Sequence, residues 1–247
     1  MRLQVIGAGP AYSDRPGDIG ACYLVRHAGA AILLDLGQGA FAGVAAAVEP
    51  SSLLATLVTH LHADHFIDLV PLRHYLRYQF RPPRRARVIA PAALRRRLDD
   101  LHGDPRFCAE ALDIEPLRAG SFAVGPFEVT AGRVTHDGDS YAFRVGVGDG
   151  RGLAYSGDVG QASDLRALVS PGDVLLVEVS FGTGPVPPGA QHLDADDVGD
   201  LAAATGPSRV LLTHLQMGFD RTATEEAVRR RFGGPVELVE PGFTTPI

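Results

Sequence analysis

The feature that most constrains this chain is a seven-residue segment, Thr-His-Leu-His-Ala-Asp-His, at residues 59–65. It follows an apolar run, residues 55–58, that is typical of a buried strand, and we expect that strand to end at His60. Continued extension would place His60 and His62 on one side, because strand side chains alternate. Asp64 and His65 then lie where the chain must turn, just before a helical pattern begins. Two pairs of potential ligands on one short loop suit two neighbouring metal ions.

Three further apolar runs end in the same kinds of side chain. The residues at these strand ends are His136, Asp158 and His214. A single histidine after a strand is more often a hydrogen-bonded residue than a ligand, but three such ends together with the segment 59–65 predict one assembled site. His27, His74 and His102 lack this context, and we expect them to be ordinary residues outside the site.

The hydrophobic pattern alternates between strand and helix signals along the chain. Strands are expected at residues 3–6, 21–25, 31–35, 55–60, 87–90, 127–134, 142–147, 153–155, 174–179, 209–213 and 236–239. Helices are expected at residues 37–48, 66–80, 92–101, 164–169, 194–204 and 222–232, with a helical turn at 107–112. Asp149-Gly150 favours a hairpin turn. Because no linker divides the chain, we predict one domain, residues 1–247, of the α/β class: a four-layer αββα sandwich of two mixed sheets with helices on the outer faces.

Charge and cysteine content narrow the class of protein. The formal charge is −6 and all 23 basic residues are arginine, which disfavours general nucleic-acid binding because that function usually shows a basic surplus. Cys22 and Cys108 lie far apart and outside any CxxC pattern, which predicts reduced thiols. The apolar run at residues 3–6 is too short for a signal peptide, and no stretch approaches the ~20 apolar residues of a membrane span. We therefore expect a cytoplasmic protein with no membrane partner.

The HxHxDH pattern of residues 60–65 and its companions resemble the metallo-β-lactamase superfamily over nearly the whole chain. The resemblance implies two sets of metal ligands. The first set is His60, His62 and His136, the second is Asp64, His65 and His214, and Asp158 bridges both. Imidazole and carboxylate ligands suit two divalent ions, Zn²⁺ first, with Mn²⁺ or Fe²⁺ as alternatives. The redox di-iron branch carries Glu at the position of His62, so the hydrolytic branch is favoured.

The chemistry expected of such a site is hydrolysis. Two metals about 3.5–4 Å apart can hold a hydroxide between them and neutralise charge on the attacked centre. Binding to zinc lowers the pKa of water towards about 7, which provides a nucleophile at neutral pH. Asp64 is expected to orient that hydroxide or to accept its proton.

A second pair of residues looks like the ribonuclease Z-like branch of the superfamily. In that branch a glutamate on a buried strand orients a histidine that protonates the leaving oxygen, and Glu178 and His192 match those positions. The residues support this independently, since a lone Glu in the apolar run 174–179 is costly unless paired and a histidine is a suitable general acid. The alternative is a structural ion pair of Glu178 with an arginine, with His192 exposed in a loop. We favour the catalytic interpretation.

The interval between His136 and Asp158 bears on the substrate. Members that process transfer-RNA ends carry a basic arm there, whereas here the interval is 22 positions and is filled by a predicted hairpin. The arm-less layout looks more like bacterial cyclic-nucleotide phosphodiesterases of the same branch, so a small phosphodiester such as 3′,5′-cyclic AMP is the leading expectation. The alternatives are a ribonuclease Z-like RNA 3′-end endonuclease, a thioester, lactone or β-lactam hydrolase, a non-catalytic metal-binding protein, and a flavoprotein bound through Gly7-Ala8-Gly9.

Nine arginines and no acidic residue lie between residues 73 and 97. Three of them share a helix face at i, i+4 spacing, and they are candidates for phosphate binding, a solvated face or a contact with a partner subunit. Tyr75 and Tyr78 on the same helix are more consistent with packing in a dimer than with base stacking, and we expect a homodimer. The loop at 182–189 leads into His192 and is a candidate lid or substrate wall, or an ordinary surface loop.

Overall fold

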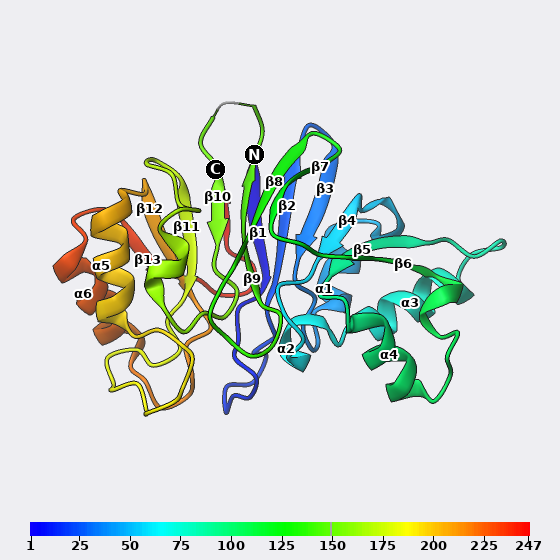
Figure 1. The fold of residues 1–247 in the computed structure, drawn as a ribbon, viewed down its shortest axis with the longest axis horizontal. Helices are drawn as coiled ribbons and strands as arrows, with labels where there is room; N and C mark the ends of the chain where they lie inside the picture. The colour runs from blue at the N-terminus through cyan, green and yellow to red at the C-terminus, as the bar shows by residue number, and fades with distance from the viewer. Residues whose placement is uncertain (149) are drawn as a thin grey trace.

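Two seven-stranded mixed sheets lie face to face in the computed structural model, which describes residues 1–148 and 150–247 (Figure 1). The first sheet has the order β14 (Thr244–Pro246), β1 (Arg2–Gly7), β2 (Cys22–His27), β3 (Ala30–Leu34), β4 (Ala55–Leu57), β5 (Ala86–Ala90) and β6 (Leu112–Pro116). The second has the order β13 (Val236–Leu238), β12 (Arg209–Thr213), β11 (Val174–Glu178), β10 (Leu153–Tyr155), β9 (Tyr141–Gly146), β8 (Phe127–Arg133) and β7 (Gly120–Val124). Asp149, in the predicted hairpin turn, lies outside the described residues.

Each sheet is antiparallel in one half and parallel in the other. In the first sheet β14, β1, β2 and β3 pair antiparallel, and β3 to β6 pair parallel. In the second sheet β7 to β10 pair antiparallel, and β10 to β13 pair parallel. Strands that run in the same direction end at the same edge, so β3 ends beside β4, and β8, β10, β11 and β12 end together. The loops that follow these strands can therefore meet.

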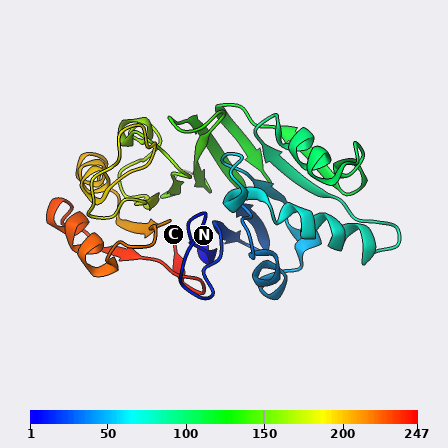
Figure 2. The ribbon, with the colours of Figure 1, turned by 90° about the horizontal axis from the view of Figure 1, so that it is seen from below.

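Three apolar clusters hold the layers together. The cluster between the sheets draws from both, for example Leu34 and Leu57 from the first sheet and Phe143, Tyr155 and Leu211 from the second. A second cluster packs α5 (Ala195–Thr205) and α6 (Arg221–Arg231) on the outer face of the second sheet. The third packs α1 (Phe41–Ala47), α2 (Ala63–Phe66), α3 (Leu69–Tyr78) and α4 (Leu94–His102) on the outer face of the first. Figure 2 shows these helices outside the two sheets, and the predicted αββα sandwich is confirmed.

The strand that leads into the metal-ligand motif is shorter than expected. β4 ends at Leu57, so the expectation that it reaches His60 is wrong. The backbone N–H of Thr59 donates to the Asp35 carboxylate at 2.7 Å instead of continuing the sheet. His60 therefore lies in a loop, and the alternation of strand side chains does not explain its orientation.

The expected helix over residues 66–80 is observed as the shorter helix α3 (Leu69–Tyr78), which is separated from the single turn α2 (Ala63–Phe66). The break occurs because the N–H of Asp68 donates to the carbonyl of Leu36 at 3.1 Å and not to its own helix. The expected helix at 164–169 is a 3₁₀ turn, η3 (Ala162–Leu165), and the turns η1 (Pro50–Ser52) and η2 (Cys108–Glu110) complete the helical elements of the described residues. Strands β6, β7 and β14 were not expected from the sequence. All three are edge strands with many exposed positions, so they lack a clear apolar pattern.

Four of the nine arginines in the segment 73–97 pair with acidic residues that follow the segment in the chain. Glu110 forms ion pairs with the buried Arg73 and with Arg77. Two exposed arginines pair with acidic residues of the edge strand β6. These exposed pairs are Arg85 with Asp113 and Arg87 with Glu115. Tyr75 is half-buried, and its hydroxyl donates to the Glu49 carboxylate at 2.9 Å.

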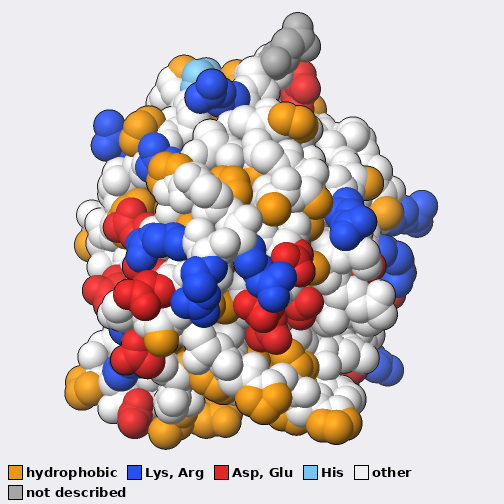
Figure 3. Space-filling view, turned by 90° about the vertical axis from the view of Figure 1, so that its left-hand side faces the viewer, with side chains coloured by type: hydrophobic (Ala, Val, Ile, Leu, Met, Phe, Trp, Pro, Cys, Tyr) orange, Lys and Arg blue, Asp and Glu red, His pale blue; other side chains and the backbone are white. Residues whose placement is uncertain are grey.

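The face formed by α5 and α6 also carries arginines that are paired with acidic residues. Figure 3 shows basic and acidic side chains interleaved there, and Arg231 pairs with both Asp196 and Asp200. This face is a mosaic of both charges without a broad basic surface. No helix in the described residues is long and apolar enough to span a membrane.

Candidate metal centre

The loops after strands of both sheets meet at one place. The segment 59–65 comes from the first sheet, between β4 and α3. His136, Asp158 and His214 follow β8, β10 and β12 of the second. The structure brings all seven predicted ligands together in two groups that share Asp158. The first group is His60, His62, His136 and Asp158, and the second is Asp64, His65, Asp158 and His214. Within each group the ligand atoms all lie within 4.8 Å of one another.

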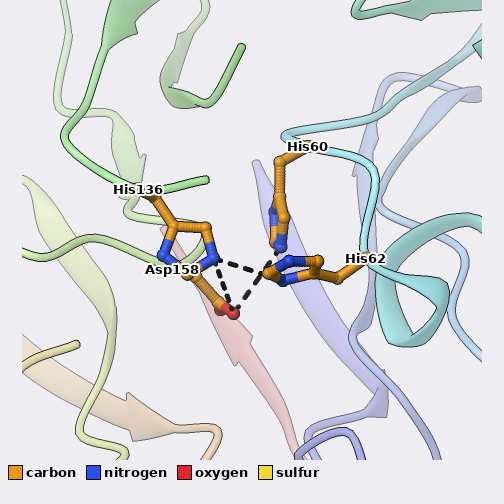
Figure 4. Close-up of side chains that lie close together, drawn as sticks. All are labelled: His60, His62, His136 and Asp158. Carbon is orange, nitrogen blue, oxygen red and sulfur yellow. Dashed lines mark hydrogen bonds and ion pairs between the residues drawn. The ribbon is translucent and has the colours of Figure 1, made fainter. Parts of the chain in front are cut away.

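Asp158 directs its two carboxylate oxygens to the two groups. Its Oδ2 lies 3.6 Å from Nε2 of His60 and 3.7 Å from Nε2 of His136 (Figure 4). Its Oδ1 lies 3.3 Å from Nε2 of His65 and 3.6 Å from Nε2 of His214. This is the arrangement that a bridging carboxylate requires.

The remaining contacts complete each group. Nδ1 of His62 lies 3.2 Å from Nε2 of His136. His62 therefore faces the centre with Nδ1, whereas the other histidines of the centre face it with Nε2. In the second group, Asp64 Oδ2 lies 3.0 Å from Nε2 of His214. Nε2 of His65 and Nε2 of His214 are 3.4 Å apart.

Four histidines are fixed through Nδ1, which leaves Nε2 for the centre. Nδ1 of His136 donates to the carbonyl of Gln191 at 2.9 Å. Nδ1 of His65 donates to the Asp35 carboxylate at 2.8 Å. The hydroxyls of Thr59 and Ser180 donate to carboxylates, so they accept from Nδ1 of His60 and of His214, at 3.0 and 3.2 Å. An imidazole protonated at Nδ1 presents a lone pair at Nε2, which is the form that binds metals.

The donor set fits metal ions. Among the described residues, His60 Nε2 and Asp158 Oδ1 are buried polar atoms without a hydrogen-bond partner, and such atoms are costly unless a ligand satisfies them. Burial and the charge of His65 hold the pKa of His60 well below its usual value, so this imidazole is neutral. Burial would raise the pKa of Asp158, but the charges of His214 and His65 lower it well below its usual value. The centre therefore offers the neutral imidazole of His60 beside an ionised carboxylate.

Asp35 is the residue of the centre that sequence reasoning missed. It is fully buried at the end of β3, and its carboxylate accepts from His65 at 2.8 Å, from Tyr155 at 2.7 Å and from both the N–H and the hydroxyl of Thr59. Its backbone φ is +58°, and that of His214 is +60°, a region that non-glycine residues rarely adopt. The one available signal was an acidic residue closing an apolar strand.

The metal-ligand loop packs against backbone that leaves no room for a side chain. The carbonyl of His65 accepts from the N–H of Leu36 at 2.8 Å. A Cβ added to Gly37 would lie 1.8 Å from the carbonyl oxygen of Asp64. Gly37 is therefore required by close approach, and it fixes the position of the loop relative to β3.

The predicted pair Glu178 and His192 forms a third group with Asp158. Nδ1 of His192 donates to Glu178 Oε1 at 2.9 Å and lies 4.0 Å from Asp158 Oδ2. Glu178 is fully buried and also accepts from the N–H of Val159 and the hydroxyl of Ser180. Burial would lower the pKa of His192, but the hydrogen bond and charge of Glu178 raise it above its usual value. The partners that Glu178 has among the described residues are backbone groups, a hydroxyl and an imidazole, and not an arginine.

A cavity of about 630 Å³ opens onto the centre. Five residues of the three groups line it: His62, Asp64, Asp158, His192 and His214. The rest of its wall is Pro10, Ala11, Tyr12, Gln38, Ala63 and Gln216. The loop 182–189 does not belong to the wall; Gly182 and Gly184 pack against Phe219 instead. His102 stacks on Phe107 away from the centre, as expected for a histidine outside the site.

Comparison with known proteins identifies the family. Residues 31–215 match the family model of the beta-lactamase superfamily domain. An uncharacterized protein of Mycobacterium tuberculosis is 31% identical over 219 residues, which cover 84% of this chain and 78% of that protein. The crystal structure of the metallo-beta-lactamase fold protein YhfI from Bacillus subtilis has a TM-score of 0.89 at 20% identity, with 99% of each chain covered. The short form of human tRNase Z has a TM-score of 0.77 at 21% identity, with 100% of this chain and 99% of that chain covered. The chain belongs to the beta-lactamase superfamily of metallo-hydrolases.

Proposed function

We propose that this metallo-hydrolase is a dinuclear phosphodiesterase that cleaves a small phosphodiester such as a cyclic nucleotide. The observation that carries the proposal is the pair of Glu178 and His192 beside the shared carboxylate Asp158. Hydrolysis of a phosphodiester expels an alkoxide, which needs a proton, whereas a thiolate leaves without one. A histidine held in place by a buried glutamate at the edge of the centre is suited to supply that proton.

The two groups that share Asp158 would hold one divalent ion each. His60, His62 and His136 would hold the first, and Asp64, His65 and His214 the second. Nitrogen and carboxylate ligands favour Zn²⁺, with Mn²⁺ or Fe²⁺ as alternatives. When bound, the ions would acidify a water molecule and neutralise negative charge on the phosphoryl oxygens.

The residues around the cavity would handle orientation and protons. Asp64 lines the cavity and would accept a hydrogen bond from the attacking water. Nδ1 of His192 is committed to Glu178, so Nε2 carries the mobile proton and would donate it to the leaving oxygen. The ester bond breaks as that oxygen becomes a hydroxyl. Ser180 donates to Glu178 and thereby helps to fix the carboxylate that positions His192.

The segment between His136 and Asp158 supports a small substrate. In the described residues it consists of β9, β10 and their connections, within the second sheet. A basic arm that would hold a long RNA finds no place in this interval. The acidic formal charge of −6 and the locally paired arginines also disfavour a polyanion.

The proposal is tested with protein loaded with Zn²⁺ or Mn²⁺ and a panel of substrates. The panel contains bis-p-nitrophenyl phosphate, 2′,3′- and 3′,5′-cyclic nucleotides, a precursor transfer RNA and a thioester. We expect the highest kcat/KM on a cyclic nucleotide. Preferred cleavage of the transfer RNA would establish the ribonuclease Z-like alternative, and preferred cleavage of the thioester would establish the other hydrolase class.

The variant His192→Ala tests the proton donor. It should keep both metals, and on cyclic nucleotides it should lose about 10²- to 10⁴-fold in kcat, the range expected for a general acid. On bis-p-nitrophenyl phosphate, whose leaving group needs little protonation, the loss should be much smaller. His27→Ala, at the end of β2, is the matched control. Equal losses on both substrates would contradict the assignment.

A further inference from the structure

Tyr12 is a large aromatic side chain that is exposed to solvent at the cavity of the metal centre. It is 67% exposed and lines the cavity together with Gln216. We propose that Tyr12 and Gln216 form a subsite for the heteroaromatic base of the substrate, with the base stacked on the ring and hydrogen-bonded to the amide. The proposal rests on the phosphodiesterase function and names the substrate class: nucleoside monophosphate esters with a single phosphate.

The loop that carries Tyr12 is held in position over the centre. The N–H of Gly9 donates to the carbonyl of Ile19 at 2.8 Å and closes the base of the loop. The amide of Gln38 donates to the carbonyl of Pro10 at 3.4 Å. Arg15 donates to the carbonyl of Leu215 at 2.9 Å, which ties the loop to the segment between His214 and Gln216. Tyr12 is therefore presented by an anchored backbone next to one of the proposed metal ligands.

The charges of the cavity wall argue for recognition by uncharged groups. Within the described part of the chain no arginine lines the cavity, and the sequence contains no lysine. The one arginine of the loop, Arg15, is occupied by Leu215 and Asp18. Apart from the proposed general acid His192 and the metal centre itself, a substrate with further phosphates would find no arginine or lysine on this wall. The part of the substrate beyond the reacting phosphate must be held by the ring, the amide and the apolar residues of the wall.

A nucleoside matches that chemistry. Every base offers a flat face that can stack on an aromatic ring, and its edge carries donors and acceptors that an amide can satisfy. The cavity volume of about 630 Å³ lies within the range of about 300–1,000 Å³ that is typical of sites for small molecules. The exposed ring would lose its contact with water on binding, which adds apolar burial to the stacking.

The experiment compares Tyr12→Phe, which keeps the ring, with Tyr12→Leu, which keeps only apolar bulk. Tyr78→Leu is the control, because Tyr78 is also half exposed but lies on α3 outside the cavity. The first readout is the ratio of kcat/KM for a 3′,5′-cyclic nucleotide to that for a base-free cyclic ribose phosphate. The second is the affinity of the metal-loaded protein for a nucleoside monophosphate, measured by calorimetry.

Tyr12→Leu should lower both the ratio and the affinity on the order of 10-fold, as expected for the loss of one stacked base. Tyr12→Phe should retain most of both, and Tyr78→Leu should change neither. Gln216→Ala should lower the affinity in the same direction. A ratio and an affinity that Tyr12→Leu leaves unaltered would overturn the subsite, as would equal losses in the Phe and Leu variants.

The two readouts separate the subsite from the proposed function. If the protein hydrolyses neither ester but binds the nucleoside monophosphate in a Tyr12-dependent way, the subsite stands and the phosphodiesterase proposal fails. If the protein hydrolyses both esters and the ratio of their kcat/KM values is the same in the wild type and in Tyr12→Leu, the function stands and the subsite fails. If it neither hydrolyses the esters nor binds the nucleotide, both fail.

Discussion

The two ligand groups of the centre differ in how firmly the protein holds them. All four residues of the second group are buried, whereas His62 and His136 of the first group are only partly buried. The fully buried Asp35 contacts the second group directly at His65, and it reaches the first group only through the Thr59 hydroxyl, which accepts from His60. In the first group, Nε2 of His62 lies 3.4 Å from Asp137, and these side chains are 40% and 79% exposed. A buried carboxylate with several donors fixes a ligand far better than an exposed one does.

From this difference we expect the two positions to hold their metal ions with different affinities. The second position would retain its ion firmly, because its ligands are fixed before the metal arrives and lie away from bulk water. Both positions border the cavity, since His62 of the first group and Asp64 and His214 of the second line its wall, but His62 and His136 of the first group are more exposed. We expect the ion of the first position to exchange more readily and to respond to substrate. Three substitutions test this contrast.

The largest effect is expected for Asp158→Ala, because this carboxylate faces both groups. Both ions should be lost together with hydrolytic activity, as measured by elemental analysis of the purified protein and by turnover of bis-p-nitrophenyl phosphate. Asp139→Ala, which removes a surface partner of Arg133, is the control. Retention of two metals per chain would show that Asp158 does not bridge.

An intermediate effect is expected for Asp35→Asn, which keeps the volume but removes the negative charge beside His65. The affinity of the second position should fall about 10- to 100-fold, the range seen when the partner of a ligating histidine is lost. Metal titration monitored by calorimetry would show the second site weakened more than the first, which Asp35 reaches only through the Thr59 hydroxyl and His60. The surface variant Asp113→Asn serves as the control. Equal weakening of both sites would break the contrast.

The smallest effect is expected for Asp137→Ala, at the exposed end of the first group. Solvent screens this contact, and exposed pairs contribute little. The affinity of the first position should change by no more than a few-fold in the same titration. A loss as large as that of Asp35→Asn would mean that the two groups are supported equally well.

Much of the centre was predictable because ligand chemistry is local in sequence. Three imidazoles and a carboxylate within the segment 59–65 and further ligand types at three strand ends indicated which residues meet. The paired character of Glu178 was also predictable, since a lone carboxylate in an apolar strand must find partners. The parallel strands supply the physical reason: their ends share an edge, so residues distant in sequence converge.

The supporting residues were not predictable from local patterns. Asp35 bonds to Thr59, His65 and Tyr155, up to 120 positions away, and these contacts exist only once both sheets pack. Arg73 and Glu110 are 37 positions apart in the sequence, so their pairing likewise exists only once the chain has folded. Composition alone made residues 73–97 look like an unpaired basic surface, because the acidic partners of four of its arginines lie later in the chain.

The left-handed backbone at His214 has a consequence for directed evolution. A non-glycine residue in this conformation costs about 1–2 kcal/mol, and that strain is kept where it holds a ligand atom in place. Selection for thermostability alone would therefore favour residues that tolerate this conformation at position 214, and it would discard the ligand in doing so. A library built on this scaffold should be screened for turnover and melting temperature together, because the two properties compete at this position.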